Sequence, residues 1–169
     1  SIISIRYTTP MSRRATTLLI LLLLVVVLGV AAIILQPRTS EGKGSIAMLD
    51  IGQGDSFLIT APSGAQLLID GGKDATVLSE LAKVMPAGDR SIDVVIGTHP
   101  DADHIGGLGP VLDRYDVGLF LTSEVEGDTQ LYRDLLAQVV DQRIPAYYVR
   151  KGMNIVLDPT TQFKTLFPD

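Results

Sequence analysis

The sequence predicts an α/β domain, with helices packed on a sheet that begins as an antiparallel meander, preceded by one transmembrane helix. Three observations predict this class. Short apolar runs broken by turn residues follow one another from Ser45 onward, which is typical of strands. Segments with apolar residues at helical spacing alternate with these runs. A long uncharged apolar run stands near the N-terminus.

The apolar run from Thr16 to Leu35 has no charged residue and is almost wholly Leu, Val, Ile and Ala. As a helix rising about 1.5 Å per residue, it is long enough for the roughly 30 Å core of a bilayer. We therefore expect a transmembrane helix over residues 16–36. A cleaved signal peptide is the alternative, but the run exceeds the usual apolar length of about 7–15 residues in such peptides.

Charges around this run predict its orientation. Arg13 and Arg14 directly precede it, and no acidic residue lies near them. Because basic residues favour the cytoplasmic side, we expect residues 1–15 in the cytoplasm and the C-terminal domain outside it. The protein would then be a single-pass membrane protein whose membrane partner is contacted through residues 16–36.

Residues 37–44 are polar and contain glycine, which predicts a linker. The domain is expected over 45–169. Its expected strands cover 46–51, 56–60, 66–70, 92–97, 117–121, 146–149, 155–157 and 163–167, and its expected helices cover 74–85, 107–115 and 131–140.

Each element has a local reason. Turn residues separate the first three strands, which gives the meander. The strand over 92–97 is nearly continuously apolar, as in strands buried on both faces. The helix from Asp74, a residue type that caps helices, stops at Pro86, and the helix over 131–140 ends before Pro145.

The charge of the exported part bears on its partners. Past Gln36 the chain has 11 basic residues (14 minus the three Arg before the span) against 19 acidic ones, a net charge of −8. Affinity for nucleic acids comes mostly from Lys and Arg, so composition does not favour a nucleic-acid partner. There is no Cys, so neither a disulfide framework nor a thiol nucleophile is available.

Both histidines of the chain lie in the segment His99-Pro100-Asp101-Ala102-Asp103-His104, which is followed by Gly106-Gly107. Pro100 disfavours a helical backbone at His99, so we expect an extended segment with His99, Asp101 and Asp103 on one face. His104 would reach a neighbouring point after the turn. Four N and O ligands would thus converge at the end of a buried strand, where α/β folds place ligands.

A divalent metal explains this cluster best, because crowded carboxylates repel one another unless a cation neutralises them. Nucleophilic triads fit poorly, since no Ser stands in a nucleophile-elbow motif. The alternative is a polar loop whose His and Asp side chains are merely solvated.

The cluster resembles the metal motif of the metallo-β-lactamase superfamily. Together with Leu49-Asp50-Ile51-Gly52-Gln53-Gly54-Asp55-Ser56 and Leu68-Ile69-Asp70-Gly71-Gly72, it is similar to the hydrolase domains of the ComEC family of DNA-uptake proteins. The resemblance covers 45–169 and implies the first half of a metallo-β-lactamase-like αββα sandwich.

The resemblance also implies roles. His99 and Asp101 would bind a first metal, Asp103 and His104 a second, and Asp70 would orient a ligand by a hydrogen bond from beneath. Asp103 would also act in catalysis by holding the attacking hydroxide.

The metal would be Zn²⁺ by preference. Asp101 stands where most of the superfamily has His, which makes Mn²⁺ or Mg²⁺ alternatives. The superfamily supplies further ligands downstream, so we expect a chain ending at Asp169 to bind metal weakly and to show little activity, although the complete protein would be an enzyme.

The loop Gly52-Gln53-Gly54-Asp55 is a weaker signal. Gln53 or Asp55 would contact substrate, or the loop is a plain hairpin connection. Three functions compete: a hydrolase of phosphodiesters such as DNA, by the ComEC resemblance; a hydrolase of a small ester, lactone or amide, which the acidic charge favours; and a non-catalytic interaction module of the cell envelope.

Overall fold

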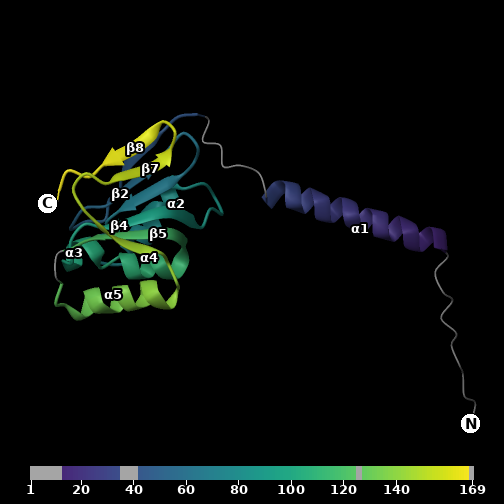
Figure 1. The fold of residues 1–169 in the computed structure, drawn as a ribbon. Helices are drawn as coiled ribbons and strands as arrows, with labels where there is room; N and C mark the ends of the chain where they lie inside the picture. Colours follow the sequence, from purple (N-terminus) through teal and green to yellow (C-terminus); the bar gives the residue numbers. More distant parts are fainter. Residues whose placement is uncertain (1–12, 35–41, 125–126, 168–169) are drawn as a thin grey trace, which may run out of the picture. The chain divides into compact units, whose positions relative to one another are not determined.

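The structure is a computed structural model that describes residues 13–34, 42–124 and 127–167 (Figure 1). The chain divides into two compact units, Ser1–Pro37 and Arg38–Asp169.

The first unit contains one helix, α1 (Arg13–Ile34). Its large apolar side chains, such as Leu18 and Val25, are exposed. Over the residues that the structure describes, no helix meets the length and hydropathy needed to cross a membrane. The end of the predicted span, at 35–36, lies outside these residues, as do most of the predicted N-terminal segment and linker.

The second unit is a mixed α/β domain with a central sheet, which confirms the α/β class predicted for this part of the chain. Its central sheet holds six strands in the spatial order β1 (Ser45–Met48), β2 (Phe57–Thr60), β3 (Gln66–Ile69), β4 (Ser91–Gly97), β5 (Asp116–Ser123) and β6 (Ala146–Val149). The helices are α2 (Thr76–Val84), α3 (Ala102–Ile105), α4 (Leu108–Arg114) and α5 (Gln130–Asp141), and a hairpin is formed by β7 (Asn154–Asp158) and β8 (Thr161–Lys164).

The sheet changes character at β3. Strands β1, β2 and β3 form the predicted antiparallel meander, whereas β3, β4, β5 and β6 are mutually parallel. Parallel neighbours need crossover connections, and the helices α2, α4 and α5 supply them. Consequently the residues that follow β3, β4 and β5 come together at one edge of the sheet.

One face of the sheet is covered by helices (Figure 1). Alternation along the strands sends Leu68, Val95 and Phe120 to this face, where they are fully buried against Leu81 and Leu108 of the helices. The buried cluster on this face is larger than the one on the other face. Because burial of each such side chain contributes about 1.5–3 kcal/mol, this face supplies most of the hydrophobic stabilisation of the described domain.

The other face carries a smaller cluster built on Ile59, Leu67, Val94 and Leu121. The hairpin β7–β8 lies over it and contributes partly buried apolar residues, including Phe163. Helices, sheet and hairpin therefore form three layers, which agrees with a metallo-β-lactamase-like sandwich as far as the described chain extends. A second helical layer is not found in that part of the chain.

A polar clamp fastens the hairpin to the sheet. The backbone N–H of Ser63, in the turn between β2 and β3, donates to Asp158 Oδ2 at 3.0 Å, and Thr160 donates to Oδ1 through its N–H and its hydroxyl, each at 2.8 Å. Burial raises the pKa of Asp158, but the hydrogen bonds from Ser63 and Thr160 outweigh it and hold this pKa well below its ordinary value.

Four sequence-based assignments need correction. Strand β1 ends at Met48, before the end of the predicted strand 46–51. The short helix α3 was not predicted. Strand β8 ends at Lys164, before most of the predicted strand 163–167. Helix α2 begins at Thr76, and Asp74 acts from outside it, because its Oδ1 accepts the Thr76 N–H at 2.9 Å; the hydrogen bonds from Thr76 lower the pKa of Asp74.

Candidate metal centre

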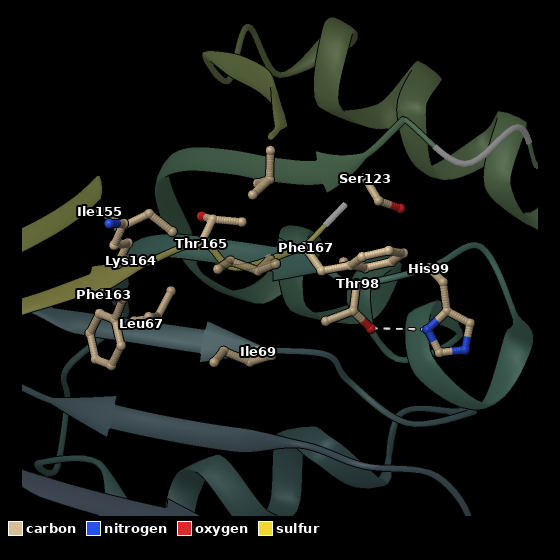
Figure 2. A pocket seen from close by; sticks show the side chains of 13 residues that line it. Leu67, Ile69, Thr98, His99, Ser123, Ile155, Phe163, Lys164, Thr165 and Phe167 are labelled. Carbon is tan, nitrogen blue, oxygen red and sulfur yellow. Dashed lines mark hydrogen bonds between the residues drawn. The ribbon is translucent and has the colours of Figure 1, made fainter. Parts of the chain in front are cut away.

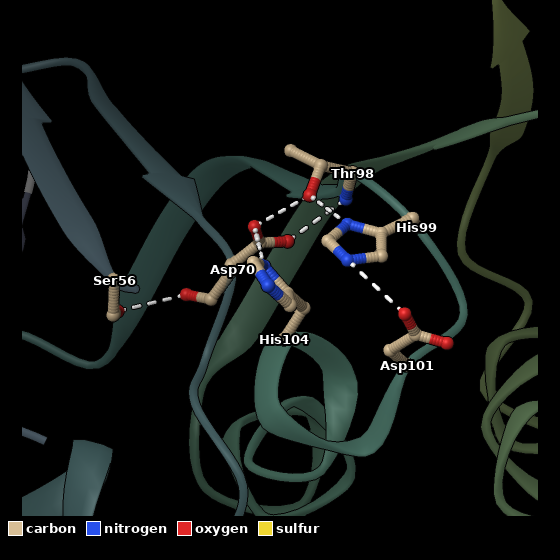
Figure 3. A network of polar contacts seen from close by, with 6 residues as sticks. All are labelled: Ser56, Asp70, Thr98, His99, Asp101 and His104. Atoms are coloured by element: carbon tan, nitrogen blue, oxygen red, sulfur yellow. Dashed lines mark hydrogen bonds and ion pairs between the residues drawn. The ribbon is translucent and has the colours of Figure 1, made fainter. Parts of the chain in front are cut away.

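Asp70 is the most firmly held of the predicted site residues (Figure 3). It follows β3 directly and is 3% exposed. Its Oδ1 accepts the Thr98 N–H at 2.8 Å, and its Oδ2 accepts the Thr98 hydroxyl at 2.6 Å and lies 2.8 Å from His104 Nδ1. Its carbonyl accepts the Ser56 hydroxyl at 2.8 Å. One buried carboxylate thus joins the ends of β3 and β4 to α3.

The backbone of Asp70 is unusual. Its φ is +57°, in the left-handed region, which Asp tolerates better than most non-glycine residues. Such conformations cost free energy and concentrate at functional sites. Here the turn directs the Asp70 carboxylate toward Thr98 and His104 (Figure 3).

The contact with Asp70 sets the tautomer of His104. A carboxylate accepts hydrogen bonds, so the proton lies on Nδ1 of the imidazole. The lone pair of Nε2 is then available to another partner. Histidines that bind metals are usually oriented in this way by a carboxylate, and the His104 side chain is 17% exposed.

His99 lies beside His104, with ring centroids 3.7 Å apart and planes inclined by 48°. Its Nδ1 is 3.0 Å from the Thr98 hydroxyl oxygen, and its Nε2 is 3.4 Å from Asp101 Oδ2. Because the Thr98 hydroxyl donates its proton to Asp70, it accepts from His99 Nδ1.

This chain of hydrogen bonds leaves the Nε2 lone pair of a neutral His99 facing the Asp101 carboxylate. A divalent cation bound by both groups would satisfy this pair of acceptors.

Asp103 lies apart from this network. The expectation that it shares an extended face with His99 and Asp101 is wrong, because the extended backbone ends at Asp101 and α3 begins at Ala102. The Asp101 carbonyl accepts the N–H groups of His104 and Ile105, each at 3.0 Å, which starts the helical turn. Asp103 is half-buried, and within the described chain its carboxylate makes no hydrogen bond or ion pair with the other predicted ligands.

Glycines allow the three motifs to meet. Gly71 N–H donates to the His104 carbonyl at 2.7 Å, and Gly107 N–H donates to the Gly72 carbonyl at 2.9 Å. A Cβ on Gly107 would lie 2.1 Å from the Gly71 carbonyl oxygen, and one on Gly54 would lie 1.9 Å from the Asp103 carbonyl oxygen. Only glycine permits these approaches, which seat α3 against the ends of the loops.

The structure also describes the loop Gly52-Gln53-Gly54-Asp55, which the sequence analysis predicts to contact substrate. Asp55 lines a shallow cavity of about 330 Å³ together with Gly52, Gly54 and Ser56. Gln53 is exposed in the same loop.

Thr98 was missed by the sequence analysis. It stands between the end of β4 and His99, and its hydroxyl connects Asp70 with His99. A hydroxyl residue directly before the first histidine was the only available signal, and such residues are common on surfaces.

The side chains at this site are of the types that bind divalent metals, but too few of them lie close together to complete a metal site. Imidazole nitrogens and carboxylates are ligands of Zn²⁺ and Mn²⁺, and the Nε2 atoms of His99 and His104 have the orientation that a cation would satisfy. Nevertheless, among residues with described side chains, no three His, Asp or Glu gather closely enough to hold a metal ion. The structure brings Asp70 to His104 and His99 to Asp101, and does not gather all four predicted ligands.

Comparisons with known proteins give the following. The family model described as "Metallo-beta-lactamase superfamily" matches residues 49–164. A crystal structure of a metallo beta lactamase from Hirschia baltica is similar at 17% identity with a TM-score of 0.36, covering 70% of this chain and 54% of that one. The chain therefore spans about half the length of that protein. No curated protein matches the sequence.

Proposed function

Because this chain belongs to the metallo-beta-lactamase superfamily, we propose that the protein is a metal-dependent hydrolase whose site includes His99, Asp101, Asp103 and His104. One observation carries the proposal: the buried Asp70 carboxylate, 2.8 Å from His104 Nδ1, fixes this imidazole with its Nε2 lone pair directed away, beside the ring of His99.

Each side chain has a task in this proposal. Asp70 orients His104 and, through Thr98, the ring of His99. His99 and Asp101 form one pair of donors, and His104 and Asp103 supply another. When bound, a divalent cation polarises the scissile bond and makes water more acidic. Asp103, which no other site residue neutralises, would position the attacking water and take up its proton.

The metal is proposed to be Zn²⁺, with Mn²⁺ or Mg²⁺ as alternatives because Asp101 adds a hard oxygen ligand. Since fewer than three donors gather in the described chain, we expect weak metal binding by these residues alone. Further donors would have to come from elsewhere in the intact protein.

Two substrate classes remain candidates. Phosphodiesters are supported by the likeness of the three motifs to ComEC-type domains. A small ester, lactone or amide is favoured by the acidic balance of the domain, since phosphodiester binding relies on Lys and Arg. We therefore propose the second class as substrate.

We further propose that residues 16–36, whose last two residues lie outside the described part of the chain, anchor the protein in a membrane, with the domain outside the cytoplasm. The support is the sequence: the uncharged apolar run continues to Leu35, and Arg13 and Arg14 precede it. Fusing a reporter enzyme that is active only outside the cytoplasm behind Asp169 tests this orientation, and an inactive fusion would contradict it.

The function is tested on the intact protein in lipid nanodiscs. It is loaded with Zn²⁺ or Mn²⁺, desalted and analysed for metal, then assayed with p-nitrophenyl acetate and with bis(p-nitrophenyl) phosphate. We expect retained metal and faster hydrolysis of the carboxylic ester. His104→Ala should lose the metal and at least about 100-fold of the activity.

Asp103→Asn separates catalysis from binding. It should lower turnover by about 10²–10⁴-fold, as expected for loss of a proton acceptor. The loss of bound metal should be smaller than in His104→Ala. If the wild-type protein retains no metal and hydrolyses neither ester, the domain is a non-catalytic interaction module and the proposal is wrong. Faster hydrolysis of the phosphodiester would support the DNA-type substrate instead.

A further inference from the structure

The hydroxyl of Thr98, the residue between the end of β4 and His99, makes two short contacts. Its Oγ1 lies 2.6 Å from Asp70 Oδ2 and 3.0 Å from His99 Nδ1. Figure 2 shows the contact with His99, and Figure 3 shows both contacts. The Asp70 side chain is 4% exposed, whereas the His99 side chain is 37% exposed. The hydroxyl thus connects a buried carboxylate with a more accessible ring.

The position of each proton in this chain of contacts follows by elimination. A hydroxyl has one proton to donate, and a carboxylate only accepts. The Thr98 hydroxyl donates its proton to Asp70, at a distance typical of an O–H group beside an ionised acceptor. Thr98 Oγ1 can then only accept from His99. The proton of a neutral His99 therefore lies on Nδ1.

The opposite tautomer would leave this network unsatisfied. With its proton on Nε2, the His99 ring would present a bare Nδ1 to Thr98, and both this nitrogen and Asp70 Oδ2 would need the single hydroxyl proton. The proton would also occupy the nitrogen that faces Asp101 Oδ2, 3.4 Å away. With the proton on Nδ1, the Nε2 lone pair faces Asp101 and can bind a cation together with it.

One carboxylate oxygen thereby acts on both histidines. Asp70 Oδ2 lies 2.8 Å from His104 Nδ1, from which it accepts directly, and it reaches His99 through the Thr98 hydroxyl. A carboxylate that accepts from the second ring nitrogen is the usual support of a metal-binding histidine. Thr98 extends this support to His99, which makes no contact of its own with Asp70 in the described network.

We propose that Thr98 is a positioning residue that selects the tautomer of His99: its hydroxyl holds the ring proton on Nδ1 and so leaves Nε2 as the atom that binds a divalent cation. Thr98 itself supplies no ligand atom. The inference rests on the proposed hydrolase function for what Nε2 binds, whereas the position of the proton requires no metal.

NMR of the intact protein in nanodiscs, with isotope-labelled histidine and with metals removed by a chelator, locates the ring protons. Spectra are recorded at about pH 8.5, above the ordinary histidine pKa of about 6.5, and His99→Gln identifies the signals of this ring. We expect the proton of both His99 and His104 on Nδ1. A wild-type His99 with its proton on Nε2, or with protons on both nitrogens, would overturn the proposal.

Thr98→Val removes the hydroxyl but keeps a β-branched side chain. The backbone N–H of residue 98, which donates to Asp70 Oδ1 at 2.8 Å, remains. We expect the His99 proton to move to Nε2, where Asp101 accepts it, while His104 keeps its proton on Nδ1. Affinity for Zn²⁺, measured by competition with a chelator, should fall by about 10–100-fold. Thr98→Ser retains a hydroxyl and should behave like the wild type in both measurements.

Thr122→Val is the matched control. It removes a hydroxyl near the end of the neighbouring strand β5, where the contact is with Tyr132 Oη at 3.5 Å, and it should change neither the ring protons nor the affinity. If Thr98→Val does not fold, as judged by circular dichroism, the wild-type spectrum decides alone.

The failure of this proposal differs from that of the hydrolase function. A wild-type protein that binds Zn²⁺, with a folded Thr98→Val variant whose His99 tautomer and affinity are unchanged, refutes the role of Thr98 alone. The expected proton positions in a wild-type protein that binds no metal uphold the selection of the tautomer by Thr98 and refute the hydrolase function.

Discussion

The two faces of the six-stranded sheet are covered to different degrees in the described chain. On the helical face, α2, α4 and α5 bury a large cluster around Leu68 and Phe120. On the other face, the second cluster has four buried residues among those described, and the hairpin β7–β8 leaves a cavity beside them. In the described chain, the helix-covered face therefore holds most of the buried apolar residues. The other face lies next to the candidate metal centre, at Thr98 and His99.

Leu67 and Leu68 test this difference between the faces, because these neighbours on β3 are both fully buried but on opposite faces. Leu68→Ala should lower the free energy of unfolding by about 4 kcal/mol, within the range of about 2–5 for such truncations. Leu67→Ala should cost about 2 kcal/mol, the lower end of this range, because the cluster around Leu67 has fewer buried residues to lose contact with. Urea denaturation measures both losses, and equal values would contradict the difference between the two faces.

Gly107→Ala tests whether the close approach of Gly107 to Gly71 is needed for the domain to fold around the candidate site. The new Cβ would meet the Gly71 carbonyl oxygen, a backbone atom that cannot turn aside, so we expect a loss of about 3 kcal/mol of unfolding free energy. Gly109→Ala is the control, since its Cβ would meet only the side-chain oxygen of Gln138 at 3.3 Å. In α4 this change should be neutral or stabilising by up to about 1 kcal/mol. Similar thermal melting of the two variants would contradict the role given to Gly107.

Asp158→Asn weakens the hydrogen bonds from Ser63 and Thr160 that fasten the hairpin to the sheet. The pKa of Asp158 is lowered in the folded protein, so its contribution is present above the ordinary pKa of about 3.9 and is lost as the pH falls through the lower folded value. We expect a lower urea midpoint for the variant at pH 7 and a shrinking difference below about pH 4. Asp116→Asn, at an exposed position, serves as the control. A difference that grows on acidification would refute this assignment.

Ser123→Ala should have the smallest effect. The Ser123 hydroxyl is buried and, among the residues described, has no hydrogen-bond partner. Removing a buried polar group without a partner is neutral or stabilises by up to about 1 kcal/mol. A clear loss of unfolding free energy would show that this hydroxyl is bonded in solution.

Much of this architecture could be predicted from the sequence because periodicity is a local signal. The meander, the buried strand β4 and the helix α5 follow from apolar spacing and turn residues. Helix α3 could not be predicted in this way, since four residues contain too little of the helical period. Its presence removed Asp103 from the face expected to hold His99 and Asp101.

Contacts between segments that are distant in the sequence could not be predicted either. Ser63 and Asp158 are 95 positions apart, and neither position carries a pattern that pairs it with the other. Asp70 was linked to a ligand only through a family resemblance. The structure shows the hydrogen bond to His104, but its role toward a metal remains a proposal. The cavity arises from tertiary packing of β3, β4 and the hairpin, which no local pattern encodes.

The claim that Asp70 prepares His104 to bind a divalent metal, on which the proposed function depends, is tested by the affinity for Zn²⁺. Competition with a chromophoric chelator would compare the intact wild-type protein with Asp70→Asn and with Asp134→Asn, an exposed position on α5. We predict a loss of about 10–100-fold in affinity for Asp70→Asn and none for Asp134→Asn. Wild-type affinity in a folded Asp70→Asn protein would contradict the claim.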